Sequence, residues 1–151
     1  MELSDQGPAI EEADVRLAEI ALGVPLPRAM RAFYLAQNGG HPSRRVHWDG
    51  RYETGIEWFL PLGRAQPASA SEGTGEATTM RLRERGLVTP DEVVFGRDGG
   101  GNALLLDRAG QVLYRPFDVG EELWRRTRLV APSFERFVAE LITEDEAGFS
   151  D

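Results

Sequence analysis

The chain has 151 residues, no cysteine and a formal net charge of −8 at pH 7, and this length suits one domain with its own core. The missing cysteines exclude disulfides and thiolate metal sites, while the acidic balance argues against direct binding to nucleic acid and favours a basic protein partner. Apolar runs stay short of the roughly 20 residues of a membrane helix, and the acidic start lacks the features of a secretory signal, so we expect no membrane contact and a cytoplasmic location.

Two helices are predicted before residue 40. The first, over residues 10–23, ends at Gly23, a natural C-terminal stop. Its predicted buried stripe consists of Ile10, Ala13, Leu17, Ile20 and Ala21. The second helix, over about 28–37, follows Pro27, whose backbone angle suits a helix start, and buries Met30, Phe33 and Tyr34. Residues 1–8 are expected to be frayed.

Residues 41–79 are predicted to form short strands and a long loop. Strands near 46–48 and 56–62, joined by a turn at Asp49 and Gly50, fit the mixture of aromatic and polar residues. From 64 to 79 the composition shifts to small and polar residues, which predicts a mobile surface loop. Residues 76–85 are compatible with a short helix.

A three-stranded meander is predicted over residues 93–114. Its apolar runs, 93–95, 103–106 and 112–114, are separated by short turn signals. Three consecutive glycines in the first turn are expected to supply backbone angles that other residues disfavour. The alternative, a phosphate-binding loop, lacks both the Rossmann pattern and the P-loop lysine, so a turn is favoured.

The C-terminal third is predicted to contain a turn-rich connector over 116–124 and then the clearest helix of the chain. Ser133 is a good N-cap for this helix, which is expected to extend to Ile142. Its apolar stripe consists of Phe134, Phe137, Val138, Leu141 and Ile142. Residues 144–151 are acidic and expected to be frayed.

The sequence offers no catalytic constellation. His41 and His47 are the only histidines, and they have no carboxylate in ligand spacing, so we expect no metal site. We also expect no cofactor and no small-molecule substrate. A hydrolase with dispersed carboxylates is an alternative, because such carboxylates meet in space and not in sequence. Its candidate residues are Asp98, Asp107, Asp118 and Glu121.

Four short motifs follow one another in a characteristic order. They are Leu26 and Pro27; Asn38, Gly39 and Gly40; Gly96, Asp98, Gly99, Gly100, Gly101 and Asp107; and Ser133, Phe134 and Phe137. Over residues 10–142 this order resembles the SUKH superfamily, which includes a fungal cell-wall-synthesis regulator and many bacterial immunity proteins. The resemblance implies a single α+β domain over residues 1–151, with a mostly antiparallel sheet of about five or six strands and helices packed on one side. It also implies no enzymatic activity, and it marks the motif residues as fold determinants.

In function, the resemblance implies an immunity protein that binds and occludes a bacterial polymorphic toxin, such as a basic nuclease domain. A regulatory or scaffold role, as in the fungal relative, is the alternative. Exposed aromatic residues with a charged rim are typical of interfaces, and two groups of residues fit. The first is Trp48, Asp49, Tyr52, Glu53, Glu57 and Trp58; the second is Asp118, Glu121 and Glu122. The alternative for Trp48 and Trp58 is that both are strand residues that face the core.

Overall fold

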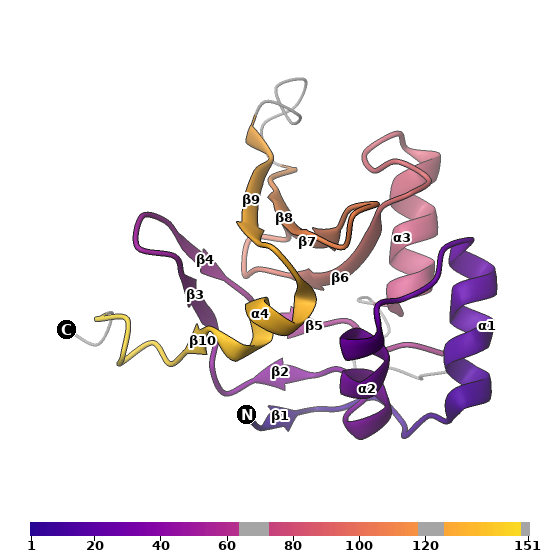
Figure 1. Ribbon diagram of the computed structural model, residues 1–151, viewed down its shortest axis with the longest axis horizontal. Helices are drawn as coiled ribbons and strands as arrows, with labels where there is room; N and C mark the ends of the chain where they lie inside the picture. Colours follow the sequence, from indigo (N-terminus) through magenta and orange to yellow (C-terminus); the bar gives the residue numbers. More distant parts are fainter. Residues whose placement is uncertain (64–72, 118–125, 149–151) are drawn as a thin grey trace.

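In a computed structural model of the chain, residues 1–63, 73–117 and 126–148 are described (Figure 1). The helices in these ranges are α1 (Glu12–Leu22), α2 (Arg28–Ala36), α3 (Gly75–Glu84) and α4 (Phe134–Ala139). The strands of the first half are β1 (Leu3–Ser4), β2 (His41–Pro42), β3 (Val46–Trp48), β4 (Glu53–Gly55) and β5 (Trp58–Phe59). Those of the second half are β6 (Val93–Arg97), β7 (Ala103–Leu106), β8 (Val112–Arg115), β9 (Arg128–Ala131) and β10 (Leu141–Ile142).

The largest sheet has five strands in the order β5-β6-β7-β8-β9, and each neighbouring pair is antiparallel. Its centre is the meander β6-β7-β8 that the sequence predicts. Two smaller sheets, β1-β2 and β10-β3-β4, complete the strands in the described ranges. The predicted α+β class and the single domain are therefore confirmed, with the antiparallel meander as the framework.

Side chains on the two faces of the main sheet enter two different apolar clusters. The larger cluster joins Phe95 and Leu104 to residues of α1, α2 and α4. The smaller cluster joins Val94 and Leu105 to Leu82 of α3. Successive strand residues point to opposite faces, so α3 is packed against the face opposite to the other three helices. The expectation that the helices pack on one side of the sheet is therefore wrong for α3.

Helix α1 exposes the stripe that was predicted to be buried. Its buried residues are Val15, Ala18 and Leu22, whereas Leu17 and Ile20 keep 52% and 76% of their surface accessible. Both sets follow helical spacing, so periodicity alone could not choose between them. The predicted end of the helix is confirmed, because Gly23 has a left-handed φ of 74°.

The hairpin that follows the second helix is shorter than predicted. The strand that pairs with β3 is β4, and the predicted strand over 56–62 is reduced to β5, which pairs with β6 in the main sheet. The polar turn after β3 is confirmed. Only two residues separate β4 from β5, although the two strands belong to different sheets. The sequence pattern does not show this change of sheet.

The loop predicted over 64–79 ends earlier than expected, because α3 begins at Gly75. Thr74 is the N-cap of α3, and its side chain accepts a hydrogen bond from the Ala77 N–H (3.1 Å). The short helix predicted over 76–85 is therefore confirmed. Residues 64–72 lie outside the described ranges.

Both predicted frayed ends contain ordered segments. The first strand, β1, pairs with β2 and buries Leu3 in the larger cluster, so fraying over 1–8 is wrong for this segment. At the other end, residues 144–148 form a turn in which the Thr143 hydroxyl accepts a hydrogen bond from the Glu146 N–H (3.1 Å). The tail at 149–151 is not among the described residues.

The last predicted helix ends at Ala139 instead of Ile142. Ser133 is its N-cap as predicted, and its hydroxyl accepts a hydrogen bond from the Arg136 N–H (3.1 Å). The next residues, Leu141 and Ile142, form β10 and pair with β3. Pairing satisfies backbone groups of the β3 edge while Leu141 stays buried, which explains why a strand replaces the last helical turn.

Candidate protein-binding surface

The β3–β4 hairpin presents two aromatic side chains at its tip. Asp49 closes the turn, since its carboxylate accepts hydrogen bonds from the N–H groups of Arg51 (2.8 Å) and Tyr52 (2.7 Å). These bonds lower the pKa of Asp49, the one from Tyr52 most strongly. Trp48 and Tyr52 keep 47% and 44% of their surface exposed, so the turn holds two aromatic rings in solvent.

The opposite face of the hairpin is anchored on α4. His47 is buried, its ring stacks on Phe137 with 5.4 Å between centroids, and its Nε2 donates to the Glu140 carboxylate (3.0 Å). Hydrogen bonds from Arg136 and from His47 lower the pKa of Glu140. Because His47 and Trp48 are successive strand residues, anchoring the first ring inward directs the second outward.

An arginine from β9 fixes the second exposed ring. The Arg128 guanidinium lies over the rings of Tyr52 (5.2 Å to the centroid) and Tyr114 (4.9 Å). Its Nη2 also donates to the Glu53 carbonyl oxygen (3.3 Å). The hairpin tip is thereby connected to the main sheet, and the Tyr52 ring packs against the Arg128 guanidinium.

The tip is also connected to the glycine-rich turn. Tyr114, under Arg128, donates from its hydroxyl to the Asp98 carboxylate (2.7 Å). Burial raises the pKa of Tyr114 to about 12, and the Asp98 hydrogen bond and charge add to this effect. Tyr114 therefore stays protonated and donates to Asp98 at neutral pH.

The first predicted contact group is divided between two places. Trp48, Asp49, Tyr52 and Glu53 lie together on the hairpin, where Trp48 and Glu53 are directly opposite each other. Trp58 is the first residue of β5, and Glu57 directly precedes it. Glu57 pairs with Arg45 (2.9 Å), and the half-buried Trp58 ring packs on His41 (4.1 Å between centroids).

The second predicted group, Asp118, Glu121 and Glu122, lies outside the described residues. The alternative of a core-facing strand residue does not fit the exposed Trp48, but it fits Trp58 in part, because that ring packs against the smaller apolar cluster. Sequence reasoning missed Arg128. It is 76 positions from Tyr52, and no local pattern connects the two residues.

The family motif residues shape the backbone away from the hairpin tip. Buried Asn38 donates to the carbonyl oxygens of Pro8 (2.8 Å) and Leu62 (3.0 Å) and accepts from the Leu62 N–H (2.8 Å). At Gly39, with φ of 76°, a Cβ would lie 2.6 Å from the Phe59 carbonyl oxygen. Glycine is therefore required there both by conformation and by space.

The triple glycine is only partly explained by backbone angles. Gly101 alone of the three has a left-handed φ, 83°, so the prediction is wrong for Gly99 and Gly100. The Asp98 carboxylate closes the turn by accepting hydrogen bonds from the N–H groups of Gly100 and Asn102, both 2.9 Å. A larger residue at Gly100 would meet only side chains, the nearest at 3.2 Å.

Two of the four carboxylates named for a hydrolase, Asp98 and Asp107, have structural partners, and the other two, Asp118 and Glu121, lie outside the described residues. Asp98 is bound by its own turn and by Tyr114, and Asp107 accepts from the N–H groups of Ala109 (3.0 Å) and Gln111 (2.9 Å). Within residues 1–63, 73–117 and 126–148, no three His, Asp or Glu side chains are grouped so as to hold a metal ion. No helix in these described ranges is long and apolar enough to cross a membrane.

Comparison with known families supports the resemblance seen in the sequence. The SMI1 / KNR4 family (SUKH-1) model matches residues 9–140. The chain belongs to this family. No curated protein matches the sequence. Proteins of the SMI1 / KNR4 family are generally non-catalytic domains of the immunity type.

Proposed function

We propose that this SMI1 / KNR4 family member is an immunity protein that acts in the cytoplasm and neutralises a bacterial toxin by binding and occluding it. The observation that carries the proposal is the hairpin tip, where Trp48 and Tyr52 are exposed and the Tyr52 ring packs against the Arg128 guanidinium. Large aromatic side chains dominate the binding energy of many interfaces, and fixed side chains lose little entropy on association. The family supports a role of this kind.

Charge supports a basic partner. With a net charge of −8, the chain attracts a basic domain such as a nuclease, and complementary charge speeds association. The hairpin tip itself is mixed in charge, because Asp49 and Glu53 alternate with Arg51 and Arg128. In this proposal, the whole molecule provides the long-range attraction and the aromatic tip provides the short-range contact.

The test is binding to a toxin domain, sought first among the products of the genes that neighbour the gene for this chain. We expect Trp48→Ala and Tyr52→Ala each to weaken the complex by roughly tenfold or more, as interface anchors do. Met80→Ala is the matched control, because Met80 is 40% exposed on α3. All three variants should keep the thermal stability of the native chain.

Two results would count against the hairpin or the role. If Trp48→Ala and Tyr52→Ala bind as tightly as Met80→Ala, the hairpin is not the contact surface. If the native chain binds no toxin domain encoded by a neighbouring gene and co-purifies only with housekeeping proteins, the regulatory or scaffold role replaces the immunity role.

A further inference from the structure

The outer face of α1 is apolar and uncovered in the described structure. Leu17 and Ile20 are 52% and 76% exposed, and Ala13 and Ala21 are exposed on the same face. Single exposed apolar residues are common on proteins, but a contiguous apolar stripe is typical of interaction sites. The helix is anchored by a different set, led by Val15 and Leu22, so the stripe is not needed for folding.

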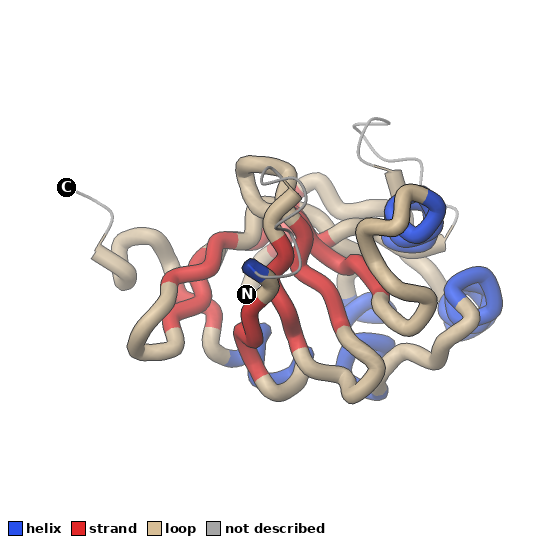
Figure 2. Tube along the Cα trace, turned by 90° about the horizontal axis from the view of Figure 1, so that it is seen from above, coloured by secondary structure: helices blue, strands red, loops and turns tan. Residues whose placement is uncertain are grey.

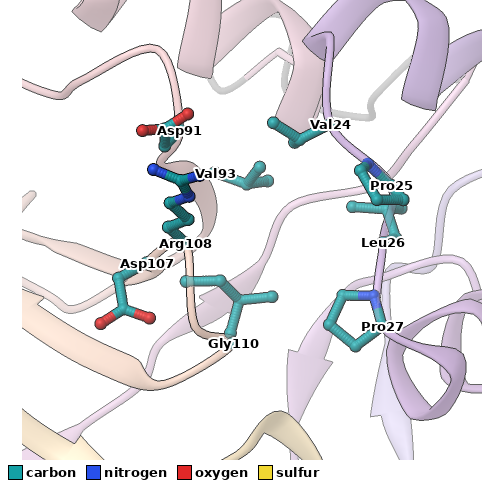
Figure 3. A pocket seen from close by; sticks show the side chains of 10 residues that line it. Val24, Pro25, Leu26, Pro27, Asp91, Val93, Asp107, Arg108 and Gly110 are labelled. Carbon is teal, nitrogen blue, oxygen red and sulfur yellow. The ribbon is translucent and has the colours of Figure 1, made fainter.

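The stripe continues into a groove. A hollow beside Ile20 reaches Val24 and Pro25, which also form one wall of a second hollow of about 240 Å³. Figure 3 shows this second hollow, with the segment from Val24 to Pro27 facing Asp91 and Arg108. The stripe and groove together can hold more than one apolar side chain. We call this combined surface the α1 groove.

The charged border of the α1 groove is acidic. The two hollows are lined by three carboxylates, Glu19, Asp91 and Asp107, and by two guanidinium groups, Arg16 and Arg108. The net charge of −8 of the whole chain adds to this excess of negative charge. The excess of carboxylates favours a basic occupant, and it would oppose a second copy of the same surface because like charges would meet.

The α1 groove lies far from the hairpin. In Figures 1 and 2, α1 and the β3–β4 hairpin are at opposite ends of the molecule. A partner bound at the hairpin tip would leave the α1 groove open. The two surfaces can therefore act independently.

We propose that the α1 groove is a second docking surface, separate from the hairpin, for a basic amphipathic protein segment. Such a segment would place leucine or isoleucine side chains over Leu17 and Ile20 and into the groove beyond Val24. Its arginine or lysine side chains would face the acidic border. Helix-in-groove recognition of this kind uses apolar anchors at helical spacing and flanking charges for orientation.

The probe is a pair of synthetic amphipathic helical peptides with the same leucine stripe, one with arginine and one with glutamate at the other positions. Each is titrated into the full chain while backbone amide resonances are recorded. We expect the arginine peptide alone to bind, with shifts confined to α1, residues 24–27 and the facing wall at residues 91–93 and 106–110, and with affinity that falls as salt rises. Equal binding of both peptides, or shifts that centre on the hairpin, would contradict the proposal.

Three variants test which residues are responsible. Leu17→Gln and Ile20→Gln keep a helix-forming residue and should each weaken arginine-peptide binding by roughly tenfold. Leu129→Gln is the control, since Leu129 is also 52% exposed but lies in β9, and it should bind as the native chain does. If Leu17→Gln and Ile20→Gln bind like the control, the proposal is wrong.

Sedimentation tests whether a second copy of the chain occupies the α1 groove. A dimer of the native chain that Ile20→Gln abolishes would make a second copy the occupant and overturn the basic segment. Toxin binding is measured on the same variants: Ile20→Gln should bind the toxin normally while Trp48→Ala does not. Failure of the peptide experiment therefore leaves the immunity role standing, and failure of toxin binding leaves the α1 groove to be judged by the peptides.

Discussion

Single glycines in this fold differ in what they do, and three of them form a graded series. Gly39 combines a φ of 76° with backbone atoms 2.6 Å from a would-be Cβ, Gly23 has only the positive φ of 74°, and Gly99 has neither constraint. We expect Gly39→Ala to destabilise by more than about 3 kcal/mol, Gly23→Ala by about 1–2 kcal/mol, and Gly99→Ala by less than about 0.5 kcal/mol. Urea denaturation of the three variants measures the order. Equal losses at Gly39 and Gly23 would show that the clash is relieved at no cost.

A second residue-scale feature is the buried ion pair of Arg115 and Glu92. Their side chains are 2% and 8% exposed and are joined by two bonds, of 2.7 Å and 2.8 Å. Removing one partner leaves the other charge buried, so Arg115→Met should cost about 3–5 kcal/mol. The double variant with Glu92→Leu should recover most of that loss. Chemical denaturation of both variants and of the native chain measures the difference.

The same pair predicts a dependence of stability on pH. Burial alone would raise the pKa of Glu92, but hydrogen bonds from Arg115 and the Thr89 N–H and the charge of Arg115 outweigh it and lower the pKa. A lowered pKa means that the stabilisation is complete above the ordinary glutamate range and is lost as pH falls through the folded-state value. Between pH 6 and pH 3, taken as roughly spanning that range, the native chain should lose more stability than the double variant. Equal losses of stability in the native chain and the double variant would contradict the assignment of this pH dependence to Glu92 and Arg115.

At the scale of elements, α4 shows how much a short helix depends on its cap. It has six residues, yet it places Phe134 and Phe137 in the larger core and carries Glu140, which anchors His47. We expect Ser133→Ala to lower the free energy of unfolding by about 1 kcal/mol, and Ser133→Asp to retain it, because aspartate also caps. Thermal unfolding of the two variants measures this. An equal loss in both would show that the Ser133 hydroxyl has another role.

Elements were predictable where one pattern had one meaning. The strands β6, β7 and β8 are apolar runs bounded by turn residues, and they form the meander that the sequence predicts. The position of helix α1 in the chain was predicted correctly, but the face predicted to be buried was wrong, because apolar residues occupy two faces of this helix. The end of α4 was missed because Leu141 is buried equally well in a helix or a strand, and pairing with β3 decides between them.

The candidate site was less predictable than the fold. Trp48 and Tyr52 were named from composition, but the packing of Tyr52 depends on Arg128, and the outward direction of Trp48 depends on His47 against Phe137. Both are contacts between distant parts of the chain. The α1 groove could not be foreseen, since Leu17 and Ile20 were expected to be buried. A sequence pattern identifies apolar residues but does not show which of them the tertiary structure leaves uncovered.

At the scale of the whole molecule, the net charge of −8 should govern the rate of association with a basic toxin. We expect the association rate constant to fall by roughly tenfold or more between 10 and 300 mM salt, with a smaller change in dissociation, because salt screens long-range attraction. Stopped-flow mixing at several salt concentrations measures both rates. An association rate constant that does not change with salt would show that the net charge does not govern toxin capture.

Neutralisation by binding can be measured by titrating the chain into a fixed amount of the toxin domain that it binds and following toxin activity. We expect the activity to fall in proportion to added protein and to end at one molecule of this chain for each toxin molecule. Toxin activity that persists in the presence of a large excess of correctly folded chain would contradict neutralisation by binding.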